Sequence, residues 1–238
     1  MRYLDLTLPT PSENLACDEA LLDLCEAGDE HEILRFWESP EHFIVLGYSN
    51  KARTEANLDA ARSAGVPVLR RCSGGGAVLQ GPGCLNYTLI LRIPDTGPLA
   101  HIADTNAFVL GKHKDLMRTV LGDTVEAHGT SDLALGTLKF SGNAQRRKRR
   151  FILFHGTILH RLDIELVERL LPMPSRQPDY RRNRRHREFL TNLERDTAPL
   201  KSALRNYWHA TKPFTELPEW RVADLARAYS SDEWNFRY

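Results

Sequence analysis

The sequence lacks any apolar run that approaches the roughly 20 residues a helix needs to span a bilayer. Its start, MRYLDLTLPTPSENLACDEA, also lacks the charged and then apolar pattern of a signal peptide. No internal repeat or low-complexity tract interrupts the 238 residues, and the apolar and charged fractions are those of an ordinary globular chain. These features predict a cytoplasmic protein with one sizeable hydrophobic core.

Cysteine is scarce, with four residues in the chain: Cys17, Cys25, Cys72 and Cys84. None forms a CxxC pair and no cluster has the spacing of metal ligands, so we predict no zinc site and no metal-binding residue. Cys17 and Cys25 fall in one helix-like segment, where we expect small apolar packing. Cys72 and Cys84 flank a glycine loop beside two arginines, which would lower the pKa of a thiol and leaves a nucleophilic role open.

A surplus of either charge is also missing, because the formal net charge is +1, but the distribution is uneven. Basic residues concentrate in RRKRR (Arg146 to Arg150) and in RQPDYRRNRRHR (Arg176 to Arg187), whereas the first thirty residues lean acidic. This asymmetry predicts an acidic or polyanionic partner on one face. The alternative interpretation is a solvated arginine-rich loop, and we expect residues 172–187 to be mobile.

Local patterns predict an α+β fold in which a mixed β-sheet is flanked by helices. Ser12 is expected to cap a helix over residues 13–27 that stops at Gly28. Residues 33–38 and 42–47 are expected to form a hairpin across Ser39 and Pro40, and residues 132–142 form a second hairpin that turns at Gly136. Further strands are predicted over 66–71, 85–93 and 150–160, and further helices over 55–65, 103–122, 163–171, 199–210 and 218–229.

The stretch RRCSGGGAV, from Arg70 to Val78, begins where a predicted strand ends. Successive glycines let backbone N–H groups approach an anion without a Cβ in the way, and the two arginines add charged donors. The stretch has neither the GK[ST] ending of a Walker A loop nor G-x-G-x-x-G spacing. Taken alone, it fits an anion-binding loop or a plain turn between strands.

Four segments in this order resemble the lipoate–protein ligase A family: RRCSGGGAV, NYT at Asn86–Thr88, KFSGNA at Lys139–Ala144 and HGT at His155–Thr157. ENLACDEALL, LRFWESPEHFIVLGYSN, FLTNL and the closing SSDEWNFRY extend the likeness over nearly the whole chain. The resemblance implies the mixed-sheet catalytic domain shared with biotin–protein ligases, which is class II synthetase-like. It also implies that residues 1–238 form a single catalytic domain without the accessory domain of larger ligases.

The activity that this resemblance implies is a two-step acyl transfer. ATP, with Mg²⁺ bridging its phosphates, and lipoate or octanoate give an acyl-adenylate and pyrophosphate. The acyl group then passes to a lysine of an acidic lipoyl domain or of a glycine cleavage H protein. A short ligase of this kind is also expected to act with a separate accessory ligase subunit, or in the second half-reaction alone.

Lys139 is the predicted catalytic residue, because a lysine in the extended, apolar TLKFSG segment needs an anionic partner. Its ammonium would hold the carboxylate and α-phosphate oxygens during adenylation; the alternative is a lysine that reaches from the strand to water. His155 fits a pocket wall or a hydrogen-bonded structural histidine equally well. The predicted cofactor-binding residues are Arg70, Arg71, Ser73, Gly74, Gly75, Gly76, Ala77, Val78, Leu79, Asn86, Asp132, Ser141, Gly142, Ala144 and His155.

The chain departs from the family pattern after the glycine loop. The ligases continue GGGAV-x-HD-x-GN, whereas Gln80 and Gly81 replace His-Asp here and Cys84 stands at the Asn position. The resulting GPG is similar to the loop of lipoyl(octanoyl) transferases, relatives that use an acyl carrier protein and a cysteine thioester. The segment before Lys139 has no cysteine where one branch of transferases places its nucleophile. An ATP-independent lipoyl or octanoyl transferase is therefore the alternative function.

A function of another class is suggested by the arginine clusters, namely a non-catalytic nucleic-acid-binding protein on the same scaffold. Tyr180 is the one aromatic residue interleaved with them that is available for base stacking. No DNA-binding module is recognisable, and a basic face that docks an acidic acceptor explains the same residues. We therefore expect neither nucleic acid nor a membrane as partner.

Overall fold

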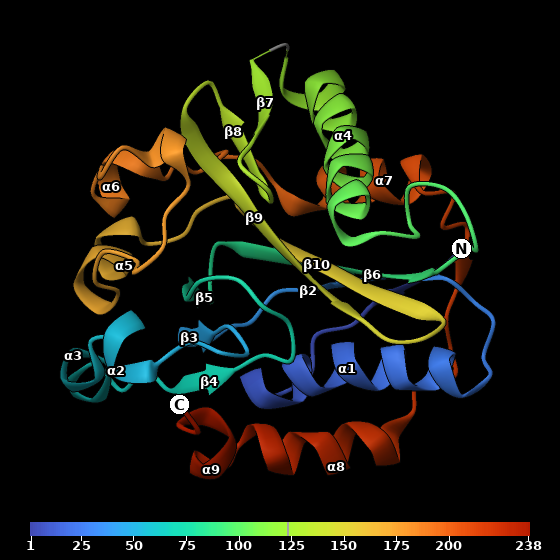
Figure 1. Cartoon of the computed structure of the whole chain (residues 1–238), viewed down its shortest axis with the longest axis horizontal. Coiled ribbons are helices and arrows are strands. Elements are labelled where there is room, and N and C mark those ends of the chain that lie inside the picture. Colours follow the sequence, from blue (N-terminus) through green and yellow to red (C-terminus); the bar gives the residue numbers. More distant parts are fainter. Residues whose placement is uncertain (123) are drawn as a thin grey trace.

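A computed structural model describes residues 1–122 and 124–238 of the chain. An eight-stranded mixed sheet forms the centre, in the order β11-β1-β2-β6-β10-β9-β8-β7 (Figure 1). Its strands are β1 (Arg2–Asp5), β2 (Ile33–Trp37), β6 (Cys84–Arg92), β7 (Val125–His128), β8 (Asp132–Leu135), β9 (Leu138–Arg147), β10 (Phe151–Leu159) and β11 (Lys212–Pro213). Strand β1 pairs in parallel with β2 and β11, and the remaining neighbours are antiparallel.

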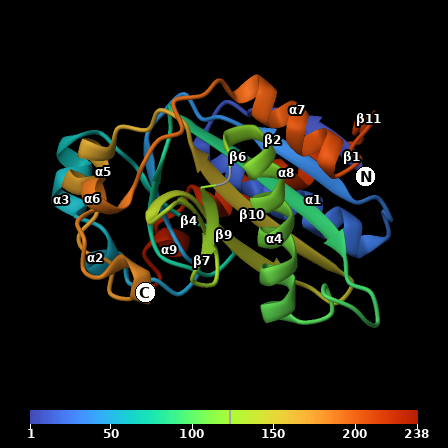
Figure 2. The same cartoon turned by 90° about the horizontal axis from the view of Figure 1, so that it is seen from above.

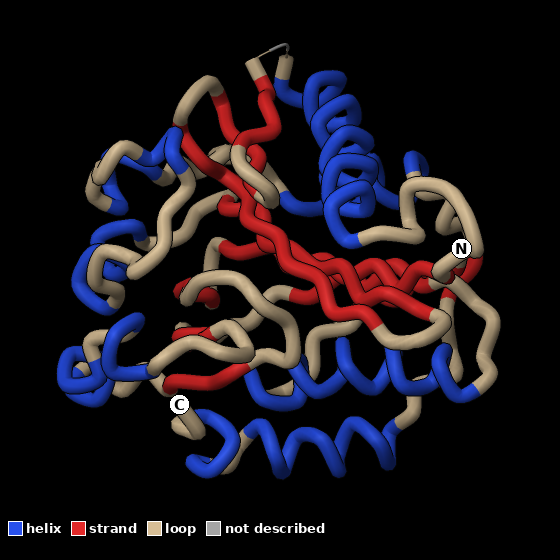
Figure 3. The backbone as a smooth tube through the Cα atoms, viewed as in Figure 1, coloured by secondary structure: helices blue, strands red, loops and turns tan. Residues whose placement is uncertain are grey.

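Helices cover both faces of this sheet, as Figure 3 shows. Helices α1 (Pro11–Ala27) and α8 (Glu219–Tyr229) pack on one face over a core that includes Ile33, Ile90 and Leu153. Helices α4 (Ile102–Leu121) and α7 (Thr197–Tyr207) pack on the other face. Side chains alternate between the two faces of a strand, so Leu34 and Leu89, which are adjacent in sequence to Ile33 and Ile90, belong to the core beneath α4 and α7. The predicted α+β fold with a mixed sheet flanked by helices is confirmed.

A smaller sheet, in the order β4-β3-β5, lies beside the glycine loop. It consists of β3 (Phe43–Leu46), β4 (Val68–Arg70) and β5 (Val78–Gln80). Figure 2 shows short helices gathered at this end of the molecule, away from the N-terminus. They are α2 (Ala52–Glu55), α3 (Leu58–Ser63), α5 (Ile164–Leu170) and α6 (His186–Phe189); a 3₁₀ turn η1 (Asp179–Arg181) and helix α9 (Asp232–Asn235) complete the set.

Two local predictions are wrong. The cap of α1 is Thr10 rather than Ser12, because the Thr10 side chain accepts from the Glu13 N–H while Glu13 bonds back to Thr10, a complete capping box. Residues 33–47 do not form a hairpin, since β2 pairs with β6 in the large sheet and β3 pairs with β4 and β5 in the small one. The hairpin at Gly136 is confirmed, with Gly136 at φ 58° between β8 and β9.

The acidic start of the chain contacts the basic segment 146–150. Lys148 pairs with Asp23 of α1, and Arg150 pairs with Glu30. The Glu26 carboxylate accepts the backbone N–H groups of residues 149–151. This basic segment therefore has partners within the chain, whereas much of the Arg176–Arg187 segment is solvent-exposed.

A buried hydrogen-bonded chain ties α4 to the sheet and to the residue that follows α7. The indole N–H of Trp208 donates to Nε2 of His113 (2.8 Å), and Nδ1 of His113 lies 3.0 Å from the Tyr87 hydroxyl. Tyr87 donates in turn to Asn143. Because an indole only donates, Nε2 of His113 must be unprotonated. Burial lowers the pKa of His113 to about 3, and nearby Lys112 adds to the shift.

This pKa predicts that the chain loses stability as the pH falls from 6.5 toward 3. Above pH 6.5 His113 is neutral in both states, whereas below it the unfolded chain binds the proton first and gains about 1.4 kcal/mol per pH unit. Urea unfolding between pH 7 and pH 4.5 measures the slope. His160 and His186 have lowered pKa values too, so the slope is a sum.

His113→Leu should therefore unfold more easily at pH 7 but show a flatter pH dependence than the wild type. His101→Gln, at an exposed histidine, is the control and should keep the wild-type slope. Equal slopes for His113→Leu and the wild type would contradict the assignment of a buried, neutral His113.

Candidate active site

A cavity of about 750 Å³ lies between the glycine loop, β9 and β10, and the segment that follows α5. Its wall includes residues from all four segments that carry the family resemblance. The tertiary structure thus brings together residues that lie far apart in the chain. The predicted site residues that line it are Arg71, Gly75, Gly76, Ala77, Val78, Leu79, Asn86, Asp132, Lys139, Gly142, Ala144 and His155.

Arg71 holds the glycine loop from inside. Its Nε donates to Ser73 Oγ (3.0 Å) and Gly74 O (3.1 Å), and Nη2 donates to Gly74 O (2.6 Å) and Gly76 O (2.9 Å). Gly75 has φ 92°, and a Cβ there would lie 2.8 Å from Arg71 Nη2, so glycine alone fits. The guanidinium thus binds the carbonyl side of the loop.

The N–H groups of the same loop lack acceptors in the part of the chain that the structure describes, and Gly75 and Gly76 line the cavity. Within the described chain, the N–H groups of Gly74, Gly75 and Gly76 donate to no other group, and these residues are exposed. Consecutive free N–H groups form a concave anion site of the kind that binds phosphate. Arg71 shapes the backbone of this loop, and its own side-chain N–H groups are directed to the loop carbonyls and to Ser73 Oγ.

Arg70 lies outside the cavity wall and is fully buried. Its guanidinium donates to carbonyl oxygens of residues 47, 48, 50, 234 and 235, and its own N–H donates to the Asn235 side chain. Arg70 thus fastens the C-terminal segment to the strand that enters the glycine loop. Arg70 therefore has a structural role, and the anion contact predicted for it from the sequence is wrong because its guanidinium lies outside the cavity wall.

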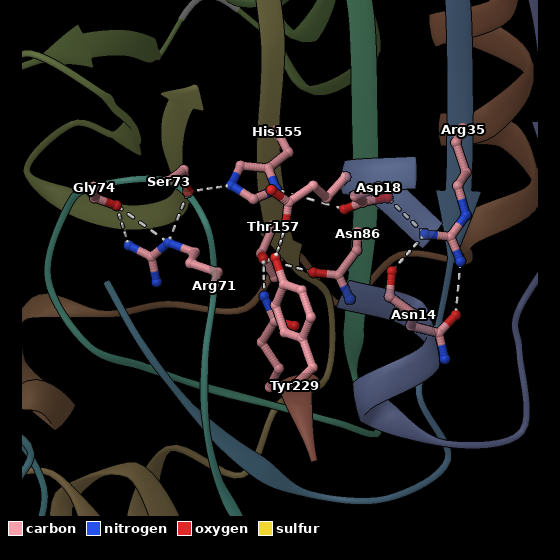
Figure 4. A network of polar contacts seen from close by, with 12 residues as sticks. Asn14, Asp18, Arg35, Arg71, Ser73, Gly74, Asn86, His155, Thr157 and Tyr229 are labelled. Carbon is pink, nitrogen blue, oxygen red and sulfur yellow. Dashed lines mark hydrogen bonds and ion pairs between the residues drawn. The ribbon is translucent and has the colours of Figure 1, made fainter. Parts of the chain in front are cut away.

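Ser73, His155 and Asp18 form a hydrogen-bonded line that Figure 4 shows beside Arg71. Ser73 Oγ lies 2.6 Å from His155 Nε2, and His155 Nδ1 lies 3.5 Å from Asp18 Oδ2. The ionised Asp18 carboxylate can only accept, which places an imidazole hydrogen of His155 on Nδ1, toward Asp18. His155 borders the cavity, whereas Ser73, Gly74 and Ser141 do not line it.

The buried Asp18 stays ionised because of its partners. Burial acts to raise its pKa, but Arg35 Nη1 at 2.6 Å, together with His155, holds the pKa below the ordinary value. Arg35 also donates to Asn14 Oδ1 (2.7 Å) and to two backbone carbonyls. A paired, hydrogen-bonded arginine of this kind fixes the position of Asp18 and through it the ring of His155.

Lys139 reaches into the cavity from the start of β9. Its Nζ lies 2.8 Å from Asp132 Oδ1, and the lysine side chain is 22% exposed. The other carboxylate oxygen of Asp132 accepts the Tyr180 hydroxyl hydrogen at 2.8 Å, and burial raises the pKa of Tyr180. Lys139 therefore has the anionic partner that an extended apolar segment requires, and it remains accessible from the cavity.

Apart from Leu79, the residues that form the apolar part of the cavity wall were not predicted from the sequence. They come from β5, from the end of β10, from α5 and from the segment after it, and they belong to the core of the smaller sheet. No feature of the sequence distinguishes these leucines and valines from ordinary core residues, so their place in the cavity wall could not be predicted. The apolar wall consists of Leu79, Leu159, Leu162, Val167, Leu171 and Leu190.

Segment 172–187, predicted to be mobile, forms part of the same wall and contains η1. Tyr180 stacks on His128 with ring centroids 4.6 Å apart, and Arg184 donates to Thr137 O at 3.0 Å. Its mobility stays a prediction.

The cysteines lie away from the cavity. Cys72 and Cys84 are both buried, and burial raises the pKa of each to about 12. Cys17 and Cys25 are also buried, with pKa values raised to about 11 and about 12. None of the four lines the cavity wall. The expectation of a lowered thiol pKa beside the arginines is wrong, because burial outweighs any favourable charge near these thiols.

No helix in residues 1–122 or 124–238 is long and apolar enough to cross a membrane. In the same residues, no group of three or more His, Cys, Asp or Glu side chains is placed to hold a metal ion.

Comparison with known proteins assigns the chain to a family. The model of the lipoyl protein ligase A/B catalytic domain matches residues 10–202. The chain therefore belongs to this family, whose members named below are lipoate–protein ligases and octanoyltransferases, enzymes of protein lipoylation. The resemblance predicted from the four motifs is confirmed, as is the prediction that the chain is an enzyme of this family.

Relatives of both activities match the chain. A lipoate-protein ligase A homologue from Aeropyrum pernix is 34% identical over 170 residues, which cover 71% of this chain and 61% of that protein. The octanoyltransferase LipM of Geobacillus kaustophilus is 28% identical over 274 residues, covering 99% of this chain and 98% of that protein. The bi-partite lipoate protein ligase of Thermoplasma acidophilum shares the fold, with a TM-score of 0.84 at 24% identity over 99% of this chain and 95% of that one.

The role of Arg71 as the internal support of the loop predicts a structural effect of a conservative change. Arg71→Lys keeps the charge but loses the fork of donors to three loop groups, so the free energy of unfolding should fall by about 2–4 kcal/mol. Hydrogen exchange at residues 73–76 should become faster. Arg195→Lys, at an exposed arginine, is the control and should change neither quantity. Unchanged exchange in the loop of Arg71→Lys would contradict this role.

Proposed function

We propose that the chain is an ATP-dependent lipoate–protein ligase that activates lipoate or octanoate as an acyl-adenylate and transfers the acyl group to a lysine of an acceptor protein. The observation that carries this proposal is the composition of one cavity. It combines the Lys139 ammonium, the free N–H groups of Gly75 and Gly76 and an apolar wall, and it excludes every thiol.

Each part of the cavity suits one part of the substrates. The apolar wall suits an acyl chain, and the glycine loop suits phosphate oxygens, because backbone N–H groups bind anions without a counter-charge nearby. Lys139 lies where the two parts meet and would stabilise the charge that develops on the carboxylate and the α-phosphate. Mg²⁺ would enter with ATP as a phosphate-bridging ion, since phosphates supply oxygens that it prefers.

The buried thiols favour the ligase over a thioester-forming transferase. A cysteine nucleophile must reach the cavity and ionise near neutral pH, and the four cysteines do neither. The alternative, an ATP-independent lipoyl or octanoyl transferase, is favoured by the match to octanoyltransferase LipM over nearly the whole of both chains. A transferase on this chain would need a direct transfer without a thioester.

The exposed arginines of segment 172–187 support an acidic acceptor. Arg176 lines the cavity, and Arg182, Arg185 and Arg187 are solvent-exposed near it. A lipoyl domain or an H protein is the partner that we propose, and an archaeal relative was solved as a bi-partite ligase together with its E2 lipoyl domain. A single catalytic domain that works with a separate accessory subunit remains part of this proposal. Binding of nucleic acid is less well supported, since Lys148 and Arg150 of segment 146–150 are already paired with carboxylates.

The ligase proposal predicts that the chain catalyses lipoate- or octanoate-dependent exchange of pyrophosphate into ATP. Lys139→Ala should lower the exchange rate about 10²–10³-fold, as expected for loss of one charge-stabilising donor. The fold should survive, because Asp132 keeps the Tyr180 hydrogen bond. Lys212→Ala, at an exposed lysine of β11, is the control and should keep the wild-type rate. Near-normal exchange by Lys139→Ala would remove Lys139 from this role.

The absence of a thiol from the cavity predicts that no cysteine is required. Each of the four Cys→Ala variants should retain acyl transfer within about threefold, with the free energy of unfolding lowered by about 1 kcal/mol by the small loss of packing. Iodoacetamide should alkylate the native wild-type protein only after denaturant is added, as mass spectrometry would show. Abolished transfer in one well-folded variant would favour the thioester transferase instead.

A further inference from the structure

One row of residues crosses five strands of the large sheet on the cavity side. Strand register places Trp37 opposite Asn86, Asn86 opposite Thr157, Thr157 opposite Gly142 and Gly142 opposite Asp132. Directly opposed residues share one face of a sheet, and neighbouring strands are about 4.8 Å apart. All five residues line the cavity, so the row forms a continuous strip of its wall.

Gly142 leaves a gap in this row because it has no side chain, and the Lys139 ammonium occupies that gap. A Cβ on Gly142 would lie 2.8 Å from Lys139 Nζ, so the missing side chain is what admits the lysine. The ammonium therefore lies over β9, between Asp132 on β8 and Thr157 on β10. Asn86 is the next residue of the row, one strand beyond Thr157.

Two buried amides meet at Thr157. Gln80 Nε2 lies 3.0 Å from Thr157 Oγ1, and Thr157 Oγ1 lies 2.7 Å from Asn86 Oδ1 (Asn86 and Thr157 in Figure 4). An amide NH₂ only donates, so Thr157 accepts from Gln80 and uses its single hydrogen to donate to Asn86. This order turns the oxygen of Asn86 toward Thr157 and leaves its NH₂ group free.

The NH₂ group of Asn86 has no hydrogen-bond partner in the described part of the chain, although Asn86 is 3% exposed. Leaving a buried donor unsatisfied costs about 1–3 kcal/mol. The chain accepts this cost at a residue of the cavity wall, in the same row over which the Lys139 ammonium lies. A ligand that presents an oxygen at this point would satisfy the donor.

The position of the row identifies that oxygen. On β10, Thr157 lies between His155, beside the glycine loop, and Leu159, in the apolar wall, and all three share one face. The row therefore marks the boundary between the anion-binding part of the cavity and the apolar part. An acyl substrate has its carboxyl group at the same boundary.

We propose that Asn86 is a catalytic residue whose Nδ2–H donates, together with the Lys139 ammonium, to the carboxyl oxygen of the acyl substrate, and that Gln80 and Thr157 are positioning residues that fix this orientation of Asn86. The inference rests on the ligase activity proposed above. In adenylation a carboxylate oxygen attacks the α-phosphorus, and the bond to pyrophosphate breaks with its electron pair. In transfer the acceptor amine attacks the carbonyl carbon, AMP leaves with the electron pair of the C–O bond, and the nitrogen releases one proton to water.

Asn86 acts in both steps through the same oxygen. It orients the carboxylate during adenylation, and during transfer it faces the oxygen that becomes an oxyanion as the amine attacks. Gln80 stands where the family pattern has histidine, and an imidazole N–H could make the same donation to Thr157. Although Gln80 departs from the family pattern, it keeps a hydrogen-bond donor to Thr157 at this position.

Substitutions at Asn86 test the catalytic part of the inference by pyrophosphate exchange with octanoate. Asn86→Asp removes the donor at constant size and should lower the exchange rate about 10²–10³-fold. Asn86→Ala adds no charge and should lower the exchange rate by a similar factor. It provides the same test if the aspartate variant does not fold. Gln145→Met is the matched control, because the Gln145 amide bonds to Asn106 away from the cavity, and it should stay within about twofold of the wild type.

Substitutions at Gln80 test the positioning part. Gln80→Met removes the donor to Thr157 and should lower the exchange rate about tenfold, whereas Gln80→His should recover most of the loss. The side-chain ¹⁵NH₂ signals of Asn86, measured by NMR, should be sharp in the wild type and shift on titration with octanoate. In Gln80→Met they should broaden. Equal rates and equal signals for the two Gln80 variants would overturn the positioning role.

The outcomes separate this inference from the ligase proposal. If the wild type shows no exchange but its Asn86 signals shift saturably with octanoate, the ligase proposal fails and the contact of Asn86 with the carboxyl group stands. If the wild type exchanges normally and both Asn86 variants stay within about threefold of it, the inference fails and the ligase proposal stands.

Discussion

The register of β6, β10 and β9 is the constraint on which the rest of the site depends. Side chains alternate between the faces of a strand, so a shift of one residue would move every polar group of the cavity into the opposite core. In the observed register, His155 and Thr157 face the cavity while Phe154 and Ile158 face the apolar core beneath α4 and α7. The core residues therefore hold the cavity-lining face in place, because a shift in register would expose their apolar side chains to the cavity.

Buried arginines fix the loops around that sheet. Arg35, Arg70 and Arg71 are each buried, and each directs its guanidinium mainly to backbone carbonyls or to one paired carboxylate. Removing a guanidinium from water is costly unless nearly all of its donors are engaged. Each arginine thus permits few arrangements of the segment around it. The glycine loop can then present its N–H groups without further ordering when a ligand binds, which lowers the entropic cost of binding.

The sequence predicted much of the architecture and many of the residues at the cavity, for reasons that can be traced. The helix over α1, the hairpin at Gly136 and the strand containing HGT have strong local periodicity or turn residues. The misplaced hairpin of residues 33–47 shows the limit of local patterns, since which sheet a strand joins depends on partners such as β6, distant in sequence. Arg70 and Ser141 are in motif segments yet lie outside the cavity wall, because adjacent residues of a strand or loop face different surroundings.

By itself the sequence determined most of the element types, the family and the presence of a glycine loop and a lysine-bearing strand, because these follow from local composition and motif order. Only the tertiary structure decided which of those groups meet. It placed the Lys139 ammonium over Gly142, enclosed all four thiols in the core and arranged Gln80, Thr157 and Asn86 as one hydrogen-bonded chain. The physical reason is that such contacts depend on strand register and burial between segments far apart in sequence, which no local preference specifies.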